Sequence, residues 1–450
     1  MTQQNRSKTP ARDQDNTNAS LQTRRENAVV RGVSTLLPRF IERAENARMW
    51  DVEGKEYIDF AGGIAVLNTG HMHATVKAAV TEQMERFSHT CFQINPYREY
   101  VQLAERLNDL VPGSGPHKTL LLSTGAEAVE NAIKIARAHT GRPGVIAFSG
   151  AFHGRTMMGL ALTGKVVPYK TGFGPLPSSV YHLPYPMAYH GVTLEQTRAA
   201  MNALFKTEIG PDRIAAIIIE PVQGEGGFYQ ADPIFLRELR QVCDQHGIVL
   251  IADEIQSGFA RTGRMFAIEH SGVEPDIITM AKSLAGGFPL AAVTGKAEIM
   301  DAPGPGGLGG TYAGSPIGCA AANAVLDVIE QEQLCPRAES IGKLMTDALE
   351  AMRRKPPLAK VIGDVRGLGA MVAMELVEQG DANRPAADLT RALVQRCAED
   401  GLIILPCGVY GNVIRFLAPL TAADELLRQG LGILENAMLA LLSERPSSNE

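Results

Sequence analysis

The chain has 450 residues, of which 45% are hydrophobic and 20% are charged, and its formal net charge is −6. This composition is typical of a globular protein with enough apolar material for one large core or two medium ones, and it excludes a mainly disordered chain. The acidic balance, without any basic run, does not fit a nucleic-acid partner, so a small-molecule substrate is the default expectation.

Residues 1–25 are predicted to be a disordered tail, because they are rich in Gln, Asn, Arg, Asp, Ser and Thr. They contain no apolar segment of the kind that a secretory signal requires. No window approaches the roughly 18 consecutive apolar residues of a membrane helix. The six cysteines form no CxxC pair, which is typical of reduced packing residues. We therefore expect a cytoplasmic protein with no membrane association and no metal site.

Residues 26–75 are predicted to form the N-terminal segment of a small domain. Their clearest feature is the stretch 48–60, which contains the turn Glu53-Gly54-Lys55. This stretch precedes the alternating pattern described next, and we expect it to join the C-terminal part of the chain.

Residues 76–325 are predicted to form a large α/β domain. Apolar strand-like runs alternate there with helical patterns, which is typical of a mostly parallel sheet between layers of helices. The predicted strands are 118–123, 145–148, 214–220, 248–253, 277–280 and 291–294. The predicted crossover helices are 126–139 and 233–246, and the second begins at a proline and stops before Gly247.

Residues 326–450 are predicted to form the C-terminal part of the small α+β domain. A long helical pattern runs from Ala324 through Met352, and Pro356-Pro357 then break it. A further segment at 361–375, a helix near 389–400 and a strand near 413–417 complete this part.

An acidic pair and a lysine follow two neighbouring predicted strands. Asp253-Glu254 ends one apolar strand, and Lys282 follows the next, within the small-residue segment 281–287. The carboxyl ends of parallel strands face the crevice where such folds bind ligands. Burial lowers the pKa of a lysine and favours the neutral amine that attacks an aldehyde. The acidic pair alone fits a solvated strand end equally well, and a lone lysine is more often a surface residue, so only the combination predicts a site.

The segment 123–127, Ser-Thr-Gly-Ala-Glu, follows a strand and opens a helix. Free backbone N–H groups and the positive end of the helix dipole would face an anion there. An ordinary Ser or Thr helix cap is the simpler interpretation of the same residues. One dipole contributes only about 0.3–1 kcal/mol, so further phosphate donors are expected. Thr311, which follows the glycine-rich run 306–310, is a candidate.

Two segments that resemble nucleotide-binding loops are rejected. Residues 159–165 fit most of a P-loop, but Val166 stands where Ser or Thr would bind magnesium. Residues 304–309 match GxGxxG, yet they neither follow a strand nor open a helix.

Together these residues resemble the class III, or subgroup II, aminotransferases of pyridoxal-phosphate (PLP) fold type I. The likeness runs from about Gly32 into the C-terminal region. The motifs that carry it are 62–71, 152–156, 220–227, 253–258 and the Lys282 segment. The resemblance implies a large domain with a mostly parallel sheet of the seven-stranded type between helices, and a smaller α+β domain from both ends of the chain. It also implies PLP as the cofactor.

The resemblance gives the matching residues roles around PLP. Lys282 would form a Schiff base with PLP, and Asp253 would pair with the ring nitrogen, whose proton makes the ring an electron sink. The remaining cofactor contacts would be Gly125 and Ala126 at the phosphate, Phe152 stacked on the ring, His153 beside it, Gln256 at the ring hydroxyl, Glu220 near Asp253, and Thr311 at the phosphate of the neighbouring subunit. The last contact implies a homodimer or a dimer of dimers.

The resemblance also implies two arginine clamps for substrate carboxylates. Arg155 would hold the distal carboxylate of 4-aminobutyrate, and Arg415 the α-carboxylate of 2-oxoglutarate or glutamate, because a planar guanidinium binds carboxylates bidentately. Glu225 would pair with Arg415 while an ω-amino acid is bound, and Ile64 and Gln93 would line the pocket. Without the motifs, a surface salt bridge is the simpler interpretation of either arginine.

The implied reaction moves the amino group of 4-aminobutyrate to 2-oxoglutarate in two stages, giving succinic semialdehyde and glutamate. Other ω-amino donors, namely 5-aminovalerate, acetylornithine and ornithine, stay open. One methylene is worth only about 1–3 kcal/mol in a pocket, so the sequence does not separate 4-aminobutyrate from 5-aminovalerate. An aminomutase or racemase on the same fold and a cofactor-free binding protein are further alternatives, and Lys282 with Asp253 argues against the last.

Overall fold

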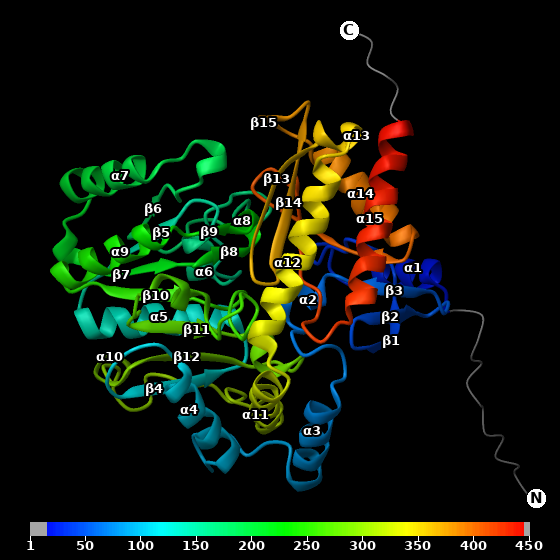
Figure 1. Cartoon of the computed structure of the whole chain (residues 1–450). Helices are drawn as coiled ribbons and strands as arrows, with labels where there is room; N and C mark the ends of the chain where they lie inside the picture. Colours follow the sequence, from blue (N-terminus) through cyan, green and yellow to red (C-terminus); the bar gives the residue numbers. More distant parts are fainter. Residues whose placement is uncertain (1–15, 445–450) are drawn as a thin grey trace, which may run out of the picture.

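The computed structural model describes residues 16–444, which are arranged around a seven-stranded sheet (Figure 1). Along this sheet the strand order is β4-β12-β11-β10-β7-β5-β6. The strands are β4 His117–Leu122, β5 Gly144–Phe148, β6 Val180–Leu183, β7 Ile214–Ile219, β10 Val249–Asp253, β11 Ile277–Met280 and β12 Ala291–Lys296. All six predicted strands are present, and β6 is an additional one. Only β12 runs antiparallel to its neighbours in this sheet, so the expected mostly parallel sheet is confirmed.

Alternate residues of the central strands pack against helices on opposite faces of this sheet. Ile218 of β7 belongs to a core cluster with α5 Gly125–Thr140, whereas Ile217 belongs to the cluster that contains α9 Pro233–His246. Every residue of β7 is buried, as expected for a parallel strand covered on both sides. Helix α9 has Pro233 in its first turn and ends at Gly247, whose φ of 61° is the left-handed conformation that glycine adopts readily.

The C-terminal part is a second, antiparallel sheet flanked by long helices. Its strands are β13 Ile362–Leu368, β14 Met371–Glu378, β15 Asp381–Pro385, β17 Leu405–Cys407 and β18 Val413–Phe416, and the helices are α14 Ala387–Glu399 and α15 Asp424–Glu444. The predicted single helix from Ala324 through Met352 is two helices, α11 Pro316–Gln331 and α12 Leu334–Arg353. The chain turns at Gln333, whose φ of 53° interrupts the helix, and apolar spacing does not reveal such a turn.

Both ends of the described chain share a third sheet. Its strands are β1 Ile41–Glu45, β2 Arg48–Asp51, β3 Glu56–Asp59 and β16 Leu402–Ile403, so the N-terminal stretch joins the C-terminal part at β16. The predicted disordered tail over residues 1–25 is wrong for residues 18–25, because Asn18–Ala28 forms helix α1. Asn18 donates a 2.9 Å hydrogen bond to Asp51, a long-range contact that polar composition does not reveal. Residues 1–15 lie outside the described residues.

The remaining elements connect these sheets or cover them. The helices are α2 Gly62–Ala65, α3 Ala74–Arg86, α4 Arg98–Leu110, α6 Met157–Leu162, α7 Leu194–Thr207, α8 Gly224–Gly227, α10 Ala297–Met300 and α13 Pro356–Ala359. The 3-10 helices are η1 Ala188–His190, η2 Pro211–Arg213, η3 Ala267–Ser271 and η4 Lys282–Ala285, and a short two-stranded sheet pairs β8 Val222–Gln223 with β9 Tyr229–Gln230.

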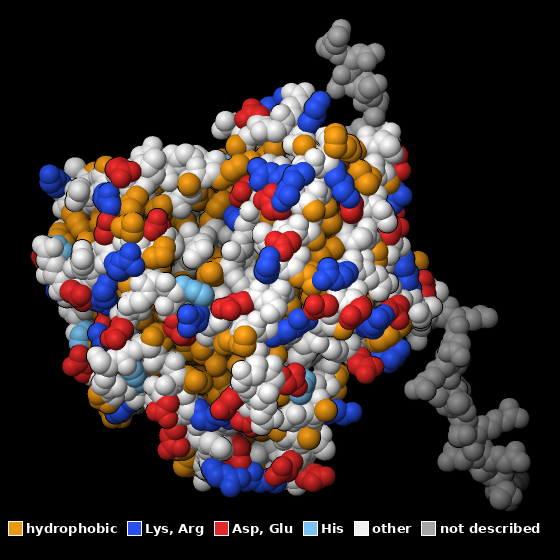
Figure 2. Space-filling model, in the orientation of Figure 1, with side chains coloured by type: hydrophobic (Ala, Val, Ile, Leu, Met, Phe, Trp, Pro, Cys, Tyr) orange, Lys and Arg blue, Asp and Glu red, His pale blue; other side chains and the backbone are white. Residues whose placement is uncertain are grey.

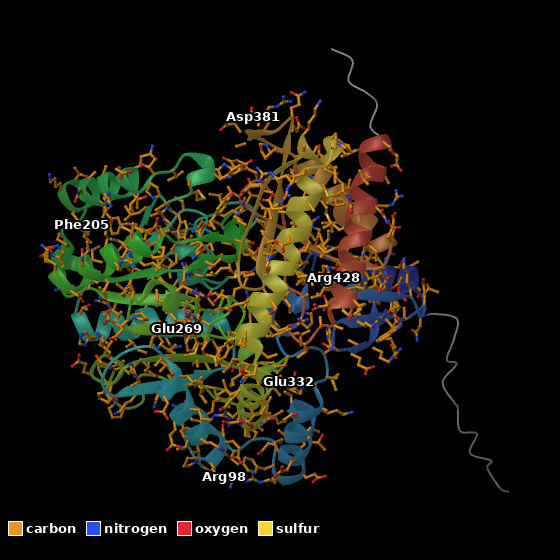
Figure 3. The ribbon with its side chains drawn as sticks, viewed as in Figure 1. Arg98, Phe205, Glu269, Glu332, Asp381 and Arg428 are labelled. Atoms are coloured by element: carbon orange, nitrogen blue, oxygen red, sulfur yellow. The ribbon has the colours of Figure 1, made fainter. Side chains whose placement is uncertain are left out.

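Side chains fill the space between the layers, from Phe205 on α7 at the left of the view to Arg428 on α15 at the right (Figure 3). On the face drawn in Figure 2, acidic and basic side chains are interspersed, with hydrophobic side chains between them. None of the helices within residues 16–444 combines the length and the apolar character that crossing a bilayer requires.

Candidate active site

A cavity of about 580 Å³ opens at the carboxyl ends of β4, β7, β10 and β11. This is the edge of the sheet at which parallel folds bind ligands. The predicted residues that line it are Gly125, Ala126, Phe152, His153, Arg155, Glu220, Glu225, Asp253, Gln256 and Lys282. The structure therefore brings together residues that are spread over more than a third of the sequence.

Lys282 enters this cavity from the first position of η4, directly after β11. Its φ of 48° is in the left-handed region, which is strained for a residue with a side chain. Burial lowers the pKa of Lys282 to about 8, although the nearby Glu225 carboxylate acts in the opposite direction. No hydrogen bond joins its amine to any residue in the described part of the chain. The amine is therefore free to react and is easily deprotonated.

Asp253 and His153 form a buried pair beside the lysine. Oδ2 of Asp253 lies 2.7 Å from Nδ1 of His153, while its Oδ1 accepts hydrogen bonds from the Thr279 hydroxyl at 3.0 Å and from the Ile255 amide at 3.1 Å. Burial lowers the pKa of His153, but the hydrogen bond to Asp253 outweighs this, so the net shift is upward. The Asp253 carboxylate is thus held in one orientation, facing the cavity.

Glu220 is a cavity residue whose carboxyl group holds the neighbouring backbone in place. Its two carboxyl oxygens accept backbone hydrogen bonds from Phe152 and Gly224, both at 2.9 Å. Burial raises the pKa of Glu220 to about 7, with His153 lowering it and Asp253 raising it further. One side chain therefore fixes the backbone of two cavity segments, the one that carries Phe152 and the one that leads to Glu225.

The start of α5 offers backbone amides to the cavity. Thr124 and Glu127 form a reciprocal capping box, in which the Glu127 carboxylate accepts from the amides of Ser123 and Thr124. The amides of Gly125 and Ala126 have no protein acceptor within residues 16–444. A Cβ added at Gly125 would lie 3.0 Å from the Ile255 side chain, so glycine leaves the approach to these amides open. Such an arrangement can hold a phosphate.

The two predicted arginine clamps differ in their surroundings. Arg155 lines the cavity, and its guanidinium lies 5.4 Å from the ring centroid of Tyr169. Arg415 is buried on β18 and donates a 2.5 Å hydrogen bond to Glu225. Burial raises the pKa of Glu225, but the charge of Arg415 outweighs this and holds it below its usual value. Glu225 is thus a carboxylate that neutralises Arg415 next to the cavity.

Four predicted residues do not line this cavity, and one of them is Arg415, which is paired with Glu225. Ile64 is 42% exposed on α2, and Thr311 is exposed after the glycine-rich loop. Gln93 donates to the carbonyl of Leu308 at 3.1 Å, so it lies against that same loop.

Sequence reasoning missed some neighbours of the cavity. Phe288 lines it, and the ring of Tyr169 lies 5.0 Å from that of Phe152. Phe288 directly follows the run of small residues after Lys282, and its place next to that run could have identified it as a cavity residue. Tyr169 belongs to no recognised motif and had none.

The cavity fits a cofactor with an aldehyde, an aromatic ring and a phosphate. Lys282 supplies an unpaired amine and the start of α5 supplies free amides. Oε1 of Gln256 and Nε2 of His153 are buried and have no hydrogen-bond partner among the described atoms, which is unusual unless a ligand supplies one. The residues present therefore fit PLP.

Comparisons with known proteins agree with this geometry. The family model described as aminotransferase class-III matches residues 29–438. The chain is 58% identical over 419 residues to the 4-aminobutyrate aminotransferase GabT of Escherichia coli, which covers 93% of this chain and 98% of that protein. It is also 58% identical over 418 residues to the 5-aminovalerate aminotransferase DavT of Pseudomonas aeruginosa, covering 93% of this chain and 97% of that protein.

Solved structures share the fold. An aminotransferase from Bacillus anthracis superposes with a TM-score of 0.86 at 28% identity, covering 94% of this chain and 98% of that one. The ornithine aminotransferase from Toxoplasma gondii gives a TM-score of 0.83 at 30% identity, covering 95% of this chain and 96% of that one. With a cavity that fits PLP and a family match over most of its length, the chain belongs to the class-III aminotransferases, which are PLP-dependent enzymes.

Proposed function

We propose that this aminotransferase takes the amino group of 4-aminobutyrate and passes it to 2-oxoglutarate, giving succinic semialdehyde and glutamate. The observation that carries the proposal is that Arg155 and Glu225 both line the cavity, and that Glu225 neutralises Arg415, which does not line it. A donor with a single carboxylate needs only Arg155. A dicarboxylate acceptor needs a second cation, and Arg415 can supply it when Glu225 moves away.

PLP, when bound, supplies the electron sink that stabilises negative charge on the substrate carbon. Lys282 would hold its aldehyde carbon, Asp253 its ring nitrogen and Gln256 its ring hydroxyl. The amides of Gly125 and Ala126 would hold the phosphate.

The protein's own side chains then position the substrate and move its proton. Lys282, with its pKa lowered to about 8, is suited to take a proton from the substrate carbon that carries the amino group and to return it. Arg155 would orient the donor through its distal carboxylate, so that this carbon faces Lys282.

Another ω-amino donor is the second candidate function. Equal identity to a 4-aminobutyrate and a 5-aminovalerate aminotransferase supports both donors equally. The structural likeness to an ornithine aminotransferase supports ornithine and acetylornithine as further candidate donors. No specific observation favours an aminomutase or a racemase.

We also propose a homodimer, alone or as a dimer of dimers, in which Thr311 reaches the phosphate site of the partner. The loop that carries Thr311 lies against the segment around Gln93, with the rings of His89 and Tyr312 5.1 Å apart. On these segments Ile94 is 73% and Tyr312 70% exposed. Large apolar side chains exposed beside an active site support a protein interface, and a second copy is the proposed occupant.

Two further proposals concern organisation and location. The chain divides into a large PLP-binding domain at 76–325 and a small domain made of 26–75 and 326–450, and the pairing of β3 with β16 supports this division. A cytoplasmic location is proposed because all six cysteines are free, as in a reducing compartment.

A donor panel tests the function. Purified, PLP-loaded protein is assayed with 2-oxoglutarate and, in turn, 4-aminobutyrate, 5-aminovalerate, ornithine and acetylornithine, and kcat/KM is compared. We expect 4-aminobutyrate to give the highest value. A far higher value with acetylornithine would overturn the assignment of 4-aminobutyrate.

A further inference from the structure

One face of the C-terminal sheet carries two arginines in a single row. Arg366 on β13 pairs with Ala373 on β14, and Ala373 pairs with Arg415 on β18. Residues that are directly opposite in an antiparallel sheet project from the same face. Arg366 and Arg415 therefore point to the same side, separated by the small side chain of Ala373.

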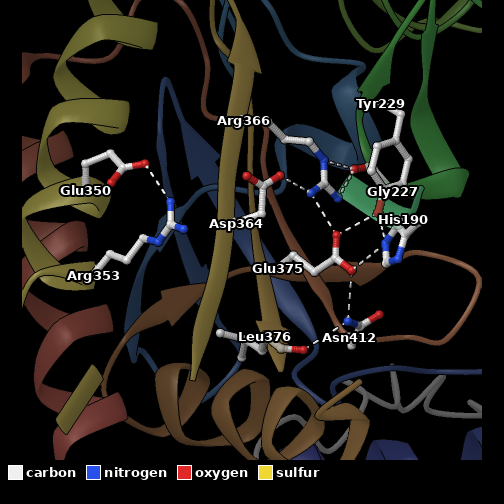
Figure 4. Close-up of polar contacts among 10 residues, drawn as sticks. All are labelled: His190, Gly227, Tyr229, Glu350, Arg353, Asp364, Arg366, Glu375, Leu376 and Asn412. Atoms are coloured by element: carbon white, nitrogen blue, oxygen red, sulfur yellow. Dashed lines mark hydrogen bonds and ion pairs between the residues drawn. The ribbon is translucent and has the colours of Figure 1, made fainter. Parts of the chain in front are cut away.

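These two arginines hold the opposite ends of α8, the short turn that carries Glu225. Arg415 donates to the Glu225 side chain, while Nε and Nη2 of Arg366 donate to the Gly227 carbonyl at 2.8 and 2.6 Å. Figure 4 shows the contact between Arg366 and Gly227. A Cβ at Gly227 would lie 2.8 Å from the Tyr229 ring, so the turn is packed closely at this end.

Arg366 is itself held by buried partners. Its Nη1 lies 2.8 Å from Glu375 and 2.7 Å from Asp364, and its guanidinium lies 3.9 Å from the ring centroid of Tyr229. Burial raises the pKa of Glu375, but the charge of Arg366 outweighs this, so the carboxyl remains ionised beside the arginine. These contacts therefore fix the guanidinium in the position from which it donates to the Gly227 carbonyl.

Glu375 links this arginine to the strand that carries Arg415. It is 1% exposed, and it also accepts from the Tyr229 hydroxyl at 2.6 Å and from the Asn412 amide at 3.2 Å (Figure 4). His190 lies 3.0 Å from the same carboxylate. Asn412 immediately precedes β18, so Glu375 fixes the start of that strand and the Arg366 contact together.

We propose that Arg366, held by Glu375, is a positioning residue for Glu225, and that it keeps the backbone of the α8 turn in place while only the Glu225 side chain moves. This inference rests on the proposed function. Arg366 does not line the cavity, and it acts on the preference between ligands with one carboxylate and ligands with two.

The expected effect follows from the equilibrium between paired and unpaired Glu225. A fixed turn favours the pair with Arg415, which disfavours a second ligand carboxylate. A loosened turn reduces the paired population, so a dicarboxylate displaces Glu225 more easily. We expect the affinity ratio of dicarboxylate to monocarboxylate to rise about tenfold, the factor expected for the loss of one hydrogen bond to a charged group.

The test compares two unreactive acids of equal length. Glutarate and valerate are titrated into the PLP-loaded protein, and their dissociation constants are measured by calorimetry. Arg366→Lys keeps the positive charge beside Glu375 but loses the planar fork that reaches Gly227. Arg353→Lys is the matched control, because Arg353 is paired with Glu350 within α12 and makes no hydrogen bond or ion pair with Glu375 or Gly227 among residues 16–444 (Figure 4). We expect the ratio to rise in Arg366→Lys and to stay at the wild-type value in Arg353→Lys.

Arg415→Met separates this inference from the proposed function. An unchanged ratio in Arg415→Met overturns both. A reduced ratio in Arg415→Met together with an unchanged ratio in Arg366→Lys overturns the positioning role alone. If Arg366→Lys fails to fold, the double variant R366Q/E375Q removes both buried charges together and takes its place in the same titration.

Discussion

Nδ1 of His153 lies 2.7 Å from Oδ2 of Asp253, and the two residues are only 1% and 3% exposed. Burial lowers the pKa of His153, but the hydrogen bond to Asp253 outweighs burial and the net shift is upward, so the contact stabilises the protonated ring. Asp253 is therefore oriented by a residue that follows a different strand. PLP affinity should depend on His153 even though Asp253 is the residue proposed to pair with the ring.

His153→Leu should weaken PLP binding about tenfold or more, because it removes a hydrogen bond to a charged group and leaves Asp253 less well oriented. His153→Asn, whose side-chain amide nitrogen lies where Nδ1 does and can still donate to Asp253, should retain most of the affinity. The measurement is the dissociation constant of PLP, obtained by titrating cofactor-free protein and following its absorbance. Wild-type affinity in His153→Leu would show that Asp253 needs no such partner.

Lys282 in cofactor-free protein should react with an amine-selective reagent with a midpoint near pH 8, because burial disfavours its charged form. Glu225→Gln should move the midpoint to lower pH, since removing a nearby negative charge destabilises the ammonium further. The readout is the pH dependence of Lys282 modification, followed by peptide mass spectrometry. A midpoint near the usual value of 10.5 would contradict this prediction.

Arg415→Ala should impair the half-reaction with 2-oxoglutarate at least about tenfold more than the half-reaction with 4-aminobutyrate, because only the acceptor needs a second cation. Arg155→Ala should impair both, since both substrates are proposed to place a carboxylate there. Single-turnover kinetics of each half-reaction measure the two losses separately. Equal losses in Arg415→Ala would refute a switch by Glu225.

Gly342→Ala should destabilise the fold, because a Cβ at this position of α12 would lie 1.9 Å from the carbonyl oxygen of Gly369. Backbone must move to accommodate it, and overpacking of this kind costs about 1–3 kcal/mol. Gly432→Ala on α15 is the control, since its Cβ would meet no atom within 4 Å and should stabilise by about 0.4–1 kcal/mol. Thermal unfolding should give a lower Tm for Gly342→Ala and no loss of Tm for Gly432→Ala.

Much of the large sheet could be predicted because its signals are local. Strand β10 is an apolar run that ends in Asp253, and α9 has a proline at its start and a glycine after its end. Helix α1 gave no such signal. It is mostly polar and is held by Asn18, whose contact with Asp51 spans 33 residues.

The motifs around Lys282 and Asp253 pointed to PLP chemistry from the sequence alone, because a lysine and a carboxylate at strand ends must face the same edge of a parallel sheet. The row of Arg366 and Arg415 has no such signal. It depends on the register of three strands, and Arg366 meets Gly227 across 139 residues. Register and long-range packing arise only when the chain is folded, so tertiary structure alone decided what holds Glu225 in place.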